Sequence, residues 1–211
     1  MSDFTYEYEN RKTPLETYEW DNVWWEHTEN EEAERILYIG DSISCGTRKA
    51  LNKKGEGKVL CNGFGTSKAV DNPYFADSLR MFLRQQSKRG VILLNNGLHG
   101  FHLSVEQYAE GYEKLVAFLR KEFVDMPLAL LLSTHVAKEE QDSEVRRRNE
   151  AVLAIAKRHG LSVIDLYTVS LTHADLLSAD GVHFLPEGYD LLADEILEYL
   201  KAELFCDPKE N

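Results

Sequence analysis

Arg35-Ile36-Leu37-Tyr38-Ile39-Gly40-Asp41-Ser42-Ile43-Ser44 is a short apolar and β-branched run that ends at a glycine, an acid and a serine. A helix-like pattern begins directly after it, so the stretch predicts a buried strand, a tight turn and a helix. The Ser42 hydroxyl would then lie at the carboxyl edge of a sheet, where N–H groups at a helix start can hold an anion. A nucleophile would be placed there.

The rest of the chain repeats this alternation of short apolar runs and longer amphipathic segments. Four further strands are predicted, at residues 58–61, 91–94, 128–132 and 161–166. Helices are predicted at residues 43–52, 72–88, 104–123, 142–159 and 186–204. A Gly-rich loop is expected at 62–67, between the second strand and the next helix. The pattern predicts an α/β domain with a five-stranded parallel sheet and helices on both faces.

The first 34 residues differ from this pattern because they are acidic and aromatic without a period of 2 or 3.6. Their aromatic side chains include Tyr6, Tyr8, Tyr18, Trp20, Trp24 and Trp25. We expect residues 1–34 to form an arm that packs on the domain formed by residues 35–211. Two alternatives are that Trp24, Trp25 or His27 lines the rim of a substrate cleft, and that the exposed aromatics serve a contact in a homo-oligomer.

Composition narrows the class of protein. The 211 residues fit one domain, and the net charge of −12 argues against nucleic acid or an anionic membrane surface as a partner. Cys45, Cys61 and Cys206 are odd in number and scattered, which predicts neither a disulfide framework nor a zinc site. With no signal-peptide pattern or membrane-length apolar run, we expect a cytoplasmic protein with reduced thiols.

A second chemistry-bearing motif lies near the end of the chain, at Asp180-Gly181-Val182-His183. An acid three residues before a histidine, in a glycine-containing loop, can place a carboxylate beside an imidazole. Asp180 would orient His183, and His183 would accept the proton of the Ser42 hydroxyl. By itself the pair is weak, because Asp-x-x-His is a frequent spacing, but Ser42 after a strand gives it a partner.

Together, Gly40-Asp41-Ser42-Ile43 and Asp180-Gly181-Val182-His183 resemble the motifs of the GDSL or SGNH hydrolases. The resemblance covers residues 35–200. It implies a flavodoxin-like three-layer α/β/α fold and a serine esterase without an organic cofactor. It also implies a catalytic triad of Ser42, Asp180 and His183.

The oxyanion hole is harder to read from the sequence. The resemblance implies a glycine after the second strand, for which Gly63 and Gly65 compete, and an asparagine after the third. Aligned by strand length, His99 stands at the asparagine position, whereas Asn95 and Asn96 come earlier. We predict Ser42, Gly65 and Asn96 as the donors, with His99 as an alternative donor or a support. A further alternative is that these side chains only end the strand by hydrogen bonding to the backbone.

Three side chains are predicted to contact substrate: Asp41, His99 and His135. Asp41 fits a turn or support residue better than a second base, and a lone histidine such as His135 is more often a rim or hydrogen-bonding residue than a ligand. No metal is predicted, because the remaining histidines have no partner at ligand spacing, namely His102, His159 and His173. Residues 146–148, three arginines among acids, are expected on a solvated helix face, and Cys45 in packing.

These features predict hydrolysis of a short acyl ester through an acyl-enzyme on Ser42. The Asn-x-Gly-Leu-His form resembles the branch of the family that removes O-acetyl groups from carbohydrates, so an acetylated sugar is the first candidate substrate. Two alternatives remain. One is a non-catalytic glycan- or nucleotide-binding module on the same fold, and the other is a thioesterase or lysophospholipase.

Overall fold

The strand that precedes Ser42 lies inside a six-stranded sheet whose order is β1-β3-β2-β4-β5-β6. The computed structural model describes residues 18–85 and 90–203. Its strands are β1 (Asp21–Trp24), β2 (Glu34–Gly40), β3 (Val59–Thr66), β4 (Val91–Leu94), β5 (Leu128–Leu131) and β6 (Ser162–Ile164). Strands β2 to β6 are parallel to one another, which confirms the five predicted parallel strands.

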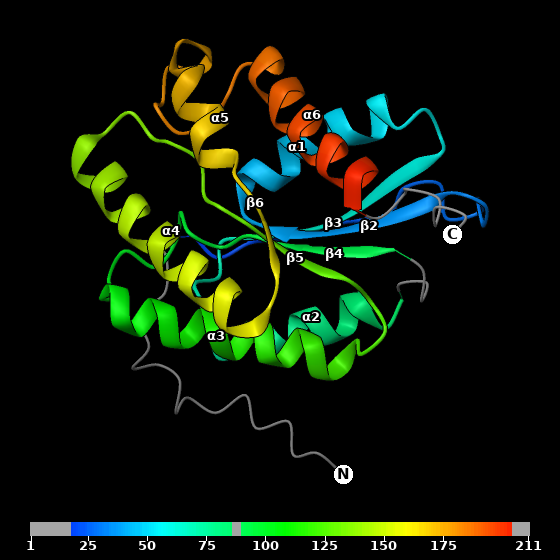
Figure 1. Cartoon of the computed structure of the whole chain (residues 1–211), viewed down its shortest axis with the longest axis horizontal. Coiled ribbons are helices and arrows are strands. Elements are labelled where there is room, and N and C mark those ends of the chain that lie inside the picture. The colour runs from blue at the N-terminus through cyan, green and yellow to red at the C-terminus, as the bar shows by residue number, and fades with distance from the viewer. Residues whose placement is uncertain (1–17, 86–89, 204–211) are drawn as a thin grey trace, which may run out of the picture.

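Helices cover both faces of this sheet and make a three-layer α/β/α fold (Figure 1). One face carries α1 (Ser42–Lys54), α5 (Leu166–Thr172) and α6 (Pro186–Glu203). The other carries α2 (Phe75–Leu83), α3 (Val105–Glu122) and α4 (Glu139–His159). Alternate residues of β2 enter the two cores, Ile36 and Tyr38 on one side and Leu37 and Ile39 on the other. The strand is therefore apolar throughout, as its sequence predicts.

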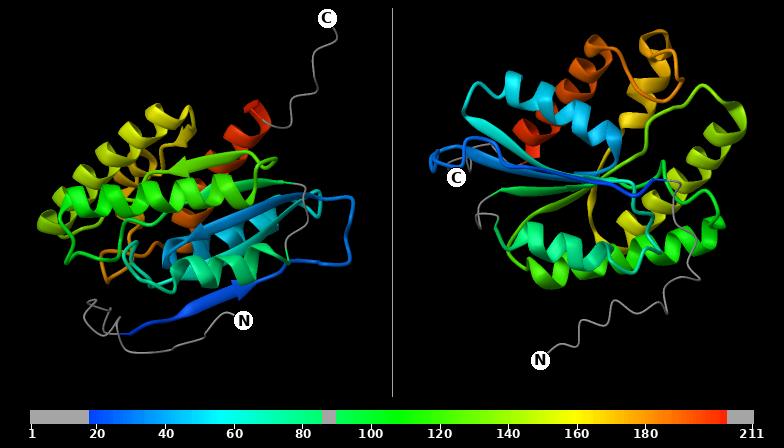
Figure 2. Two further views of the ribbon diagram at one scale, coloured as in Figure 1. Left: turned by 90° about the horizontal axis from the view of Figure 1, so that it is seen from below. Right: turned by 180° about the vertical axis from the view of Figure 1, so that it is seen from behind.

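The sixth strand, β1, was not expected. It pairs antiparallel with β3 at the edge of the sheet, with Asp21 opposite Thr66 and Trp24 opposite Gly63 (Figure 2). All four of its residues are exposed, so the segment lacks the apolar alternation that identifies a strand. Because β1 is antiparallel, its first residue lies where the parallel strands end. Residues 1–17 of the expected arm lie outside the described residues.

The expectation of a Gly-rich loop at 62–67 was wrong, because β3 continues through both glycines to Thr66. Helix α1 packs directly on them. A Cβ atom on Gly63 would lie 2.6 Å from the Arg48 guanidinium, and one on Gly65 would lie 2.3 Å from Cys45 Sγ. These glycines permit the close approach of α1 to the sheet.

Helix ends follow local signals closely. Ser104 caps α3 and forms a capping box with Gln107, and Gly160 ends α4 at φ 62°, both as predicted. Helix α4 begins at Glu139, three residues earlier than expected, and α2 ends at Leu83, short of the predicted 88. Helix α5 and the 3₁₀ turn Ala174–Leu176 were not predicted. No helix within 18–85 and 90–203 has the length and apolar character needed to cross a bilayer.

Candidate active site

Ser42 is the first residue of α1, directly after the carboxyl end of β2. Asp41 caps the helix, and its Oδ1 accepts a hydrogen bond from the Ile43 N–H at 2.9 Å. The Asp41 carbonyl accepts a second bond from Ser44 Oγ at 2.7 Å. Ser42 is partly exposed while Asp41, Ile43 and Ser44 are buried. The turn therefore presents one hydroxyl, beside the N–H groups of a helix start.

The structure brings Ser42, His183 and Asp180 together from opposite ends of the chain. His183 Nε2 lies 2.8 Å from Ser42 Oγ, and His183 Nδ1 lies 2.7 Å from Asp180 Oδ2. An ionised carboxylate only accepts hydrogen bonds, so Nδ1 carries the proton that faces Asp180. In the neutral ring Nε2 is then the acceptor, aimed at the Ser42 hydroxyl.

The loop that holds this pair is stabilised by its own backbone. Asp180 Oδ1 accepts from the N–H groups of Val182 and His183, at 2.8 and 2.9 Å, and from the Ser178 hydroxyl. The His183 N–H, the His183 imidazole and the Val182 N–H hold the pKa of Asp180 well below its usual range. Asp180 therefore stays ionised throughout the pH range in which an esterase is assayed, and Nδ1 stays oriented.

Asp41 is the other carboxylate at this turn, and it is fully buried. Burial raises the pKa of Asp41, while the His99 imidazole, the Ile43 N–H and the His183 imidazole act in the opposite direction. Both imidazoles therefore lie within electrostatic reach of this carboxylate. Because a raised pKa favours the neutral acid, the stability that Asp41 gives the fold is greatest at low pH and decreases as pH rises through its folded pKa.

Asp41→Asn should consequently be tolerated better than Asp41→Ala. Asparagine keeps the oxygen that caps α1 and removes the buried charge, whereas alanine removes the cap at a cost of about 1 kcal/mol. Urea unfolding at pH 5 and pH 7 should show Asn above Ala at both values, with a flatter pH dependence for Asn than for wild type. Equal destabilisation by the two substitutions would contradict the capping role.

The two other predicted oxyanion residues have different surroundings from those expected. Gly65 lies within β3 between Gly40 of β2 and Asn22 of β1, against the side chain of Cys45. Asn96 is 1% exposed, and its amide donates to the Lys68 carbonyl at 2.9 Å. Asn95 is also buried and donates to the Leu131 carbonyl. Both asparagines thus connect the segment after β4 to the backbone at the ends of the neighbouring strands, Lys68 after β3 and Leu131 in β5.

His99 is the partly exposed polar side chain of the same loop. Its ring lies edge-on to that of Trp20, with centroids 6.4 Å apart and planes at 76°. The His99 imidazole acts to lower the pKa of Asp41, so it lies near the turn that carries Ser42. Of the three candidates after β4, His99 is the one whose side chain is accessible at this edge of the sheet.

Comparison with known proteins identifies the fold. No family model matches the sequence, and no curated protein matches it. Solved structures do match. A member of the lipolytic G-D-S-L family from Veillonella parvula DSM 2008 is 23% identical, with a TM-score of 0.66 over 80% of this chain and 99% of that one. The chain has the SGNH hydrolase fold.

Two further structures support the same assignment of fold. The lipase/acylhydrolase from Enterococcus faecalis is 20% identical, with a TM-score of 0.64 over 84% of this chain and all of that one. An acetyl xylan esterase is 17% identical, with a TM-score of 0.62 over 79% of this chain and 99% of that one. At these identities the likeness concerns the fold, and the chemistry must be argued from the site.

A residue that the sequence analysis missed, Arg148, holds the His99 loop of this SGNH fold. It was expected on a solvated helix face, but its side chain is 0% exposed, whereas Arg146 and Arg147 are largely exposed as predicted. Its guanidinium donates to three carbonyls of this loop, those of Gly97, His99 and Gly100, at 3.1, 2.6 and 2.8 Å. The expectation of a solvated face was wrong for Arg148.

His135 lies after β5, in a different polar cluster. Its Nδ1 is 2.7 Å from Asp142 Oδ1, and the same buried carboxylate accepts from Tyr167 and Arg146 at 2.8 and 2.7 Å. The cluster is connected to the Asp180–His183 loop by the backbone, because the Ala137 N–H donates to the Gly181 carbonyl. His135 is thus a rim residue with a fixed ring rather than a member of the Ser42 cluster.

The expected rim aromatics of the arm lie elsewhere. Trp25 packs on Phe82 in the core, with ring centroids 4.6 Å apart, and Trp24 lies over the Arg48 guanidinium. His27 is exposed beside Glu29. The arm residue at the site is Trp20, which precedes β1. These positions do not favour the alternative that Trp24, Trp25 or His27 lines the rim.

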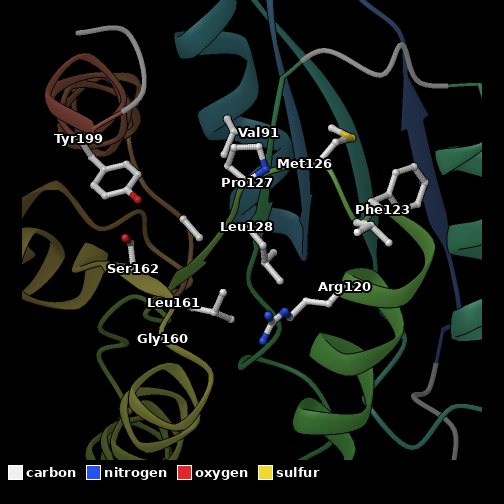
Figure 3. Close-up of a pocket in the computed structure, with 12 residues that line it drawn as sticks. Val91, Arg120, Phe123, Met126, Pro127, Leu128, Gly160, Leu161, Ser162 and Tyr199 are labelled. Atoms are coloured by element: carbon white, nitrogen blue, oxygen red, sulfur yellow. The ribbon is translucent and has the colours of Figure 1, made fainter. Parts of the chain in front are cut away.

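A cavity of about 400 Å³ lies at the opposite edge of the SGNH fold (Figure 3). It is lined by Val91, Leu128 and Ser162, the first residues of β4, β5 and β6, so it is remote from the carboxyl edge that carries Ser42. Elsewhere, His102 pairs with Asp71 and His159 with Glu113. In the described part of the chain, no three His, Cys, Asp or Glu side chains are grouped to hold a metal ion.

Proposed function

We propose that the protein hydrolyses short acyl esters through an acyl-enzyme on Ser42. The observation that carries the proposal is the continuous contact from Ser42 Oγ to His183 Nε2 and from His183 Nδ1 to Asp180. A serine so connected to an oriented base is an activated nucleophile. A module that only binds glycans does not need a carboxylate, an imidazole and a hydroxyl connected in this way.

The reaction follows from the orientation of the imidazole. Ser42 Oγ attacks the ester carbonyl as its proton moves to Nε2 of His183, and Asp180 stabilises the imidazolium. The imidazolium then donates the proton to the leaving alcohol oxygen as the C–O bond breaks. In the second half, water loses a proton to Nε2 and attacks the acyl carbon, which releases the acid and restores Ser42.

The developing oxyanion needs aligned donors. We assign the Ser42 N–H at the start of α1 and a ring N–H of His99. His99 replaces Asn96 in this role because the Asn96 amide is buried on the Lys68 carbonyl. His99 requires the tautomer, or the charged form, that carries the proton on the nitrogen facing the substrate.

His99→Ala should lower kcat about 100-fold, the usual cost of removing one oxyanion donor. His99→Asn restores an amide donor and should recover most of that loss. His102→Ala removes a nearby histidine that pairs with Asp71 and serves as the matched control. Steady-state kinetics on p-nitrophenyl acetate measures all three. A His99→Ala enzyme within twofold of wild type would remove His99 from the oxyanion hole.

An acetyl group on a sugar is the proposed substrate. The support is the similar acetyl xylan esterase structure and the Asn-x-Gly-Leu-His form at residues 95–99. A panel of p-nitrophenyl acetate, butyrate and decanoate, acetyl thioester, lysophospholipid and acetylated xyloside tests it. The acetate and the xyloside should give the highest kcat/KM. A higher kcat/KM for the thioester or the lysophospholipid would show that the protein is a thioesterase or a lysophospholipase instead. Sugar binding without hydrolysis would indicate the non-catalytic binding module.

A further inference from the structure

Trp20 reaches the catalytic edge because β1 is antiparallel to the strand beside it. Asp21, the first residue of β1, pairs with Thr66, the last residue of β3. The residue before β1 therefore lies beyond the carboxyl end of β3, on the edge that carries Ser42. Trp24, at the far end of β1, pairs with Gly63 and lies over Arg48 instead.

The backbone fixes Trp20 at this place. Its N–H donates to Ser67 Oγ at 2.8 Å, and its carbonyl accepts from the Ser67 N–H at 3.1 Å. The next residue, Asp21, holds Lys68 Nζ at 2.7 Å. Because these contacts hold the backbone of Trp20 in place, little conformational entropy is lost when a ligand packs on its ring.

The ring itself forms one wall of an aromatic corner. It is partly exposed and meets the His99 ring nearly at right angles. His99 is in turn held by Arg148 through its carbonyl. The corner thus joins an indole face to the loop that we assign to the oxyanion hole.

We propose that this corner binds the pyranose ring of the alcohol part of the substrate, an inference that rests on the proposed function. The face of an indole is electron-rich and attracts the polarised C–H groups of a sugar ring. The charges nearby favour a neutral ligand, because the Lys68 ammonium is already paired with Asp21. An anionic sugar or a phosphate would have to compete with Asp21 for that charge.

The test compares an acetyl ester whose alcohol has no ring with an acetyl ester whose alcohol is a pyranose. Ethyl acetate reports the chemistry, and methyl 2,3,4-tri-O-acetyl-β-D-xylopyranoside reports ring binding, both followed by pH-stat titration. Trp20→Ala should lower the ratio of kcat/KM for the xyloside to that for ethyl acetate at least fivefold, mainly through KM. Trp20→Phe should recover most of the ratio, and Trp24→Ala, the matched control on the same strand, should keep it.

Binding without turnover separates this inference from the proposed function. In Ser42→Ala, the xyloside should change tryptophan fluorescence, and Ser42→Ala with Trp20→Phe should lose that change. An unchanged ratio in Trp20→Ala, or an equal loss on both esters, would overturn the ring platform and leave the esterase proposal intact. A wild-type enzyme that hydrolyses neither ester while Trp20-dependent binding persists would overturn the proposed function and support the platform.

Discussion

Ser42→Ala should lower kcat/KM for p-nitrophenyl acetate by at least about 10⁴-fold, because it removes the only atom that can form the acyl bond in the proposed route. His183 and Asp180 then have no nucleophile to activate. The fold should be unaffected, since the Ser42 side chain is partly exposed and its hydroxyl bonds to His183, which is also partly exposed. Circular dichroism and urea unfolding check that expectation alongside the kinetics.

Ser44→Ala is the matched control for this substitution. Ser44 lies two residues further along the same helix turn, but it is 3% exposed and its Oγ donates to the Asp41 carbonyl. It should lose less than tenfold in kcat/KM. Equal losses in the two variants would mean that the turn, and not the Ser42 hydroxyl, limits activity.

Arg148→Met should lower the free energy of unfolding by about 3 kcal/mol or more, since three buried loop carbonyls lose a charged donor. The same change should reduce kcat, because Arg148 no longer holds the loop in place through the carbonyls of Gly97, His99 and Gly100. Urea unfolding followed by circular dichroism measures the first effect, and p-nitrophenyl acetate hydrolysis measures the second.

Arg147→Met provides the comparison, because Arg147 is adjacent in sequence and 60% exposed in its side chain, where it pairs with Glu144. An exposed substitution of this kind is expected to change stability by about 0.5 kcal/mol or less. If Arg148→Met proved as mild as Arg147→Met, the loop would owe its position to other contacts, and the positioning role of Arg148 would be withdrawn.

The turn at Ser42 could be predicted because its determinants are local. An apolar run covered on both faces, a capping acid and a helix start all lie within ten residues, and each has a recognisable pattern. The Asp180–His183 loop was equally readable, since one carboxylate binds two N–H groups within three residues. Bringing the two motifs together needed the resemblance to the SGNH hydrolases, because the Asp180–His183 loop follows α5 and a 3₁₀ turn and not a strand.

Arg148 was misread although a signal was present. Val145, Arg148, Asn149 and Val152 follow the i, i+3, i+4, i+7 spacing of the buried face of α4. The spacing alone places Arg148 inward, whereas three consecutive arginines among acids indicate a charged surface. The helical pattern does not explain why a charged side chain is tolerated in the core. The explanation is the carbonyl groups of a loop about fifty residues earlier in the chain.

The roles of Asn96, His99 and Trp20 depend on contacts that no local pattern contains. Asn96 and His99 are both polar residues after β4, and only the position of the Lys68 carbonyl makes Asn96 a buried support. Trp20 reaches His99 through the pairing of an exposed strand with β3, whose sequence has no strand period. Non-local backbone pairing, rather than composition, decides these three positions.

Active-site labelling tests the central claim most directly. A fluorophosphonate reacts with an activated serine as the serine oxygen bonds to phosphorus and fluoride leaves, so intact-mass and peptide mass spectrometry can locate the adduct. The account predicts one adduct on Ser42 in the wild-type protein, none in Ser42→Ala and strongly slowed labelling in His183→Ala. A wild-type protein that remains unlabelled, or an adduct on another residue that persists in Ser42→Ala, would contradict it.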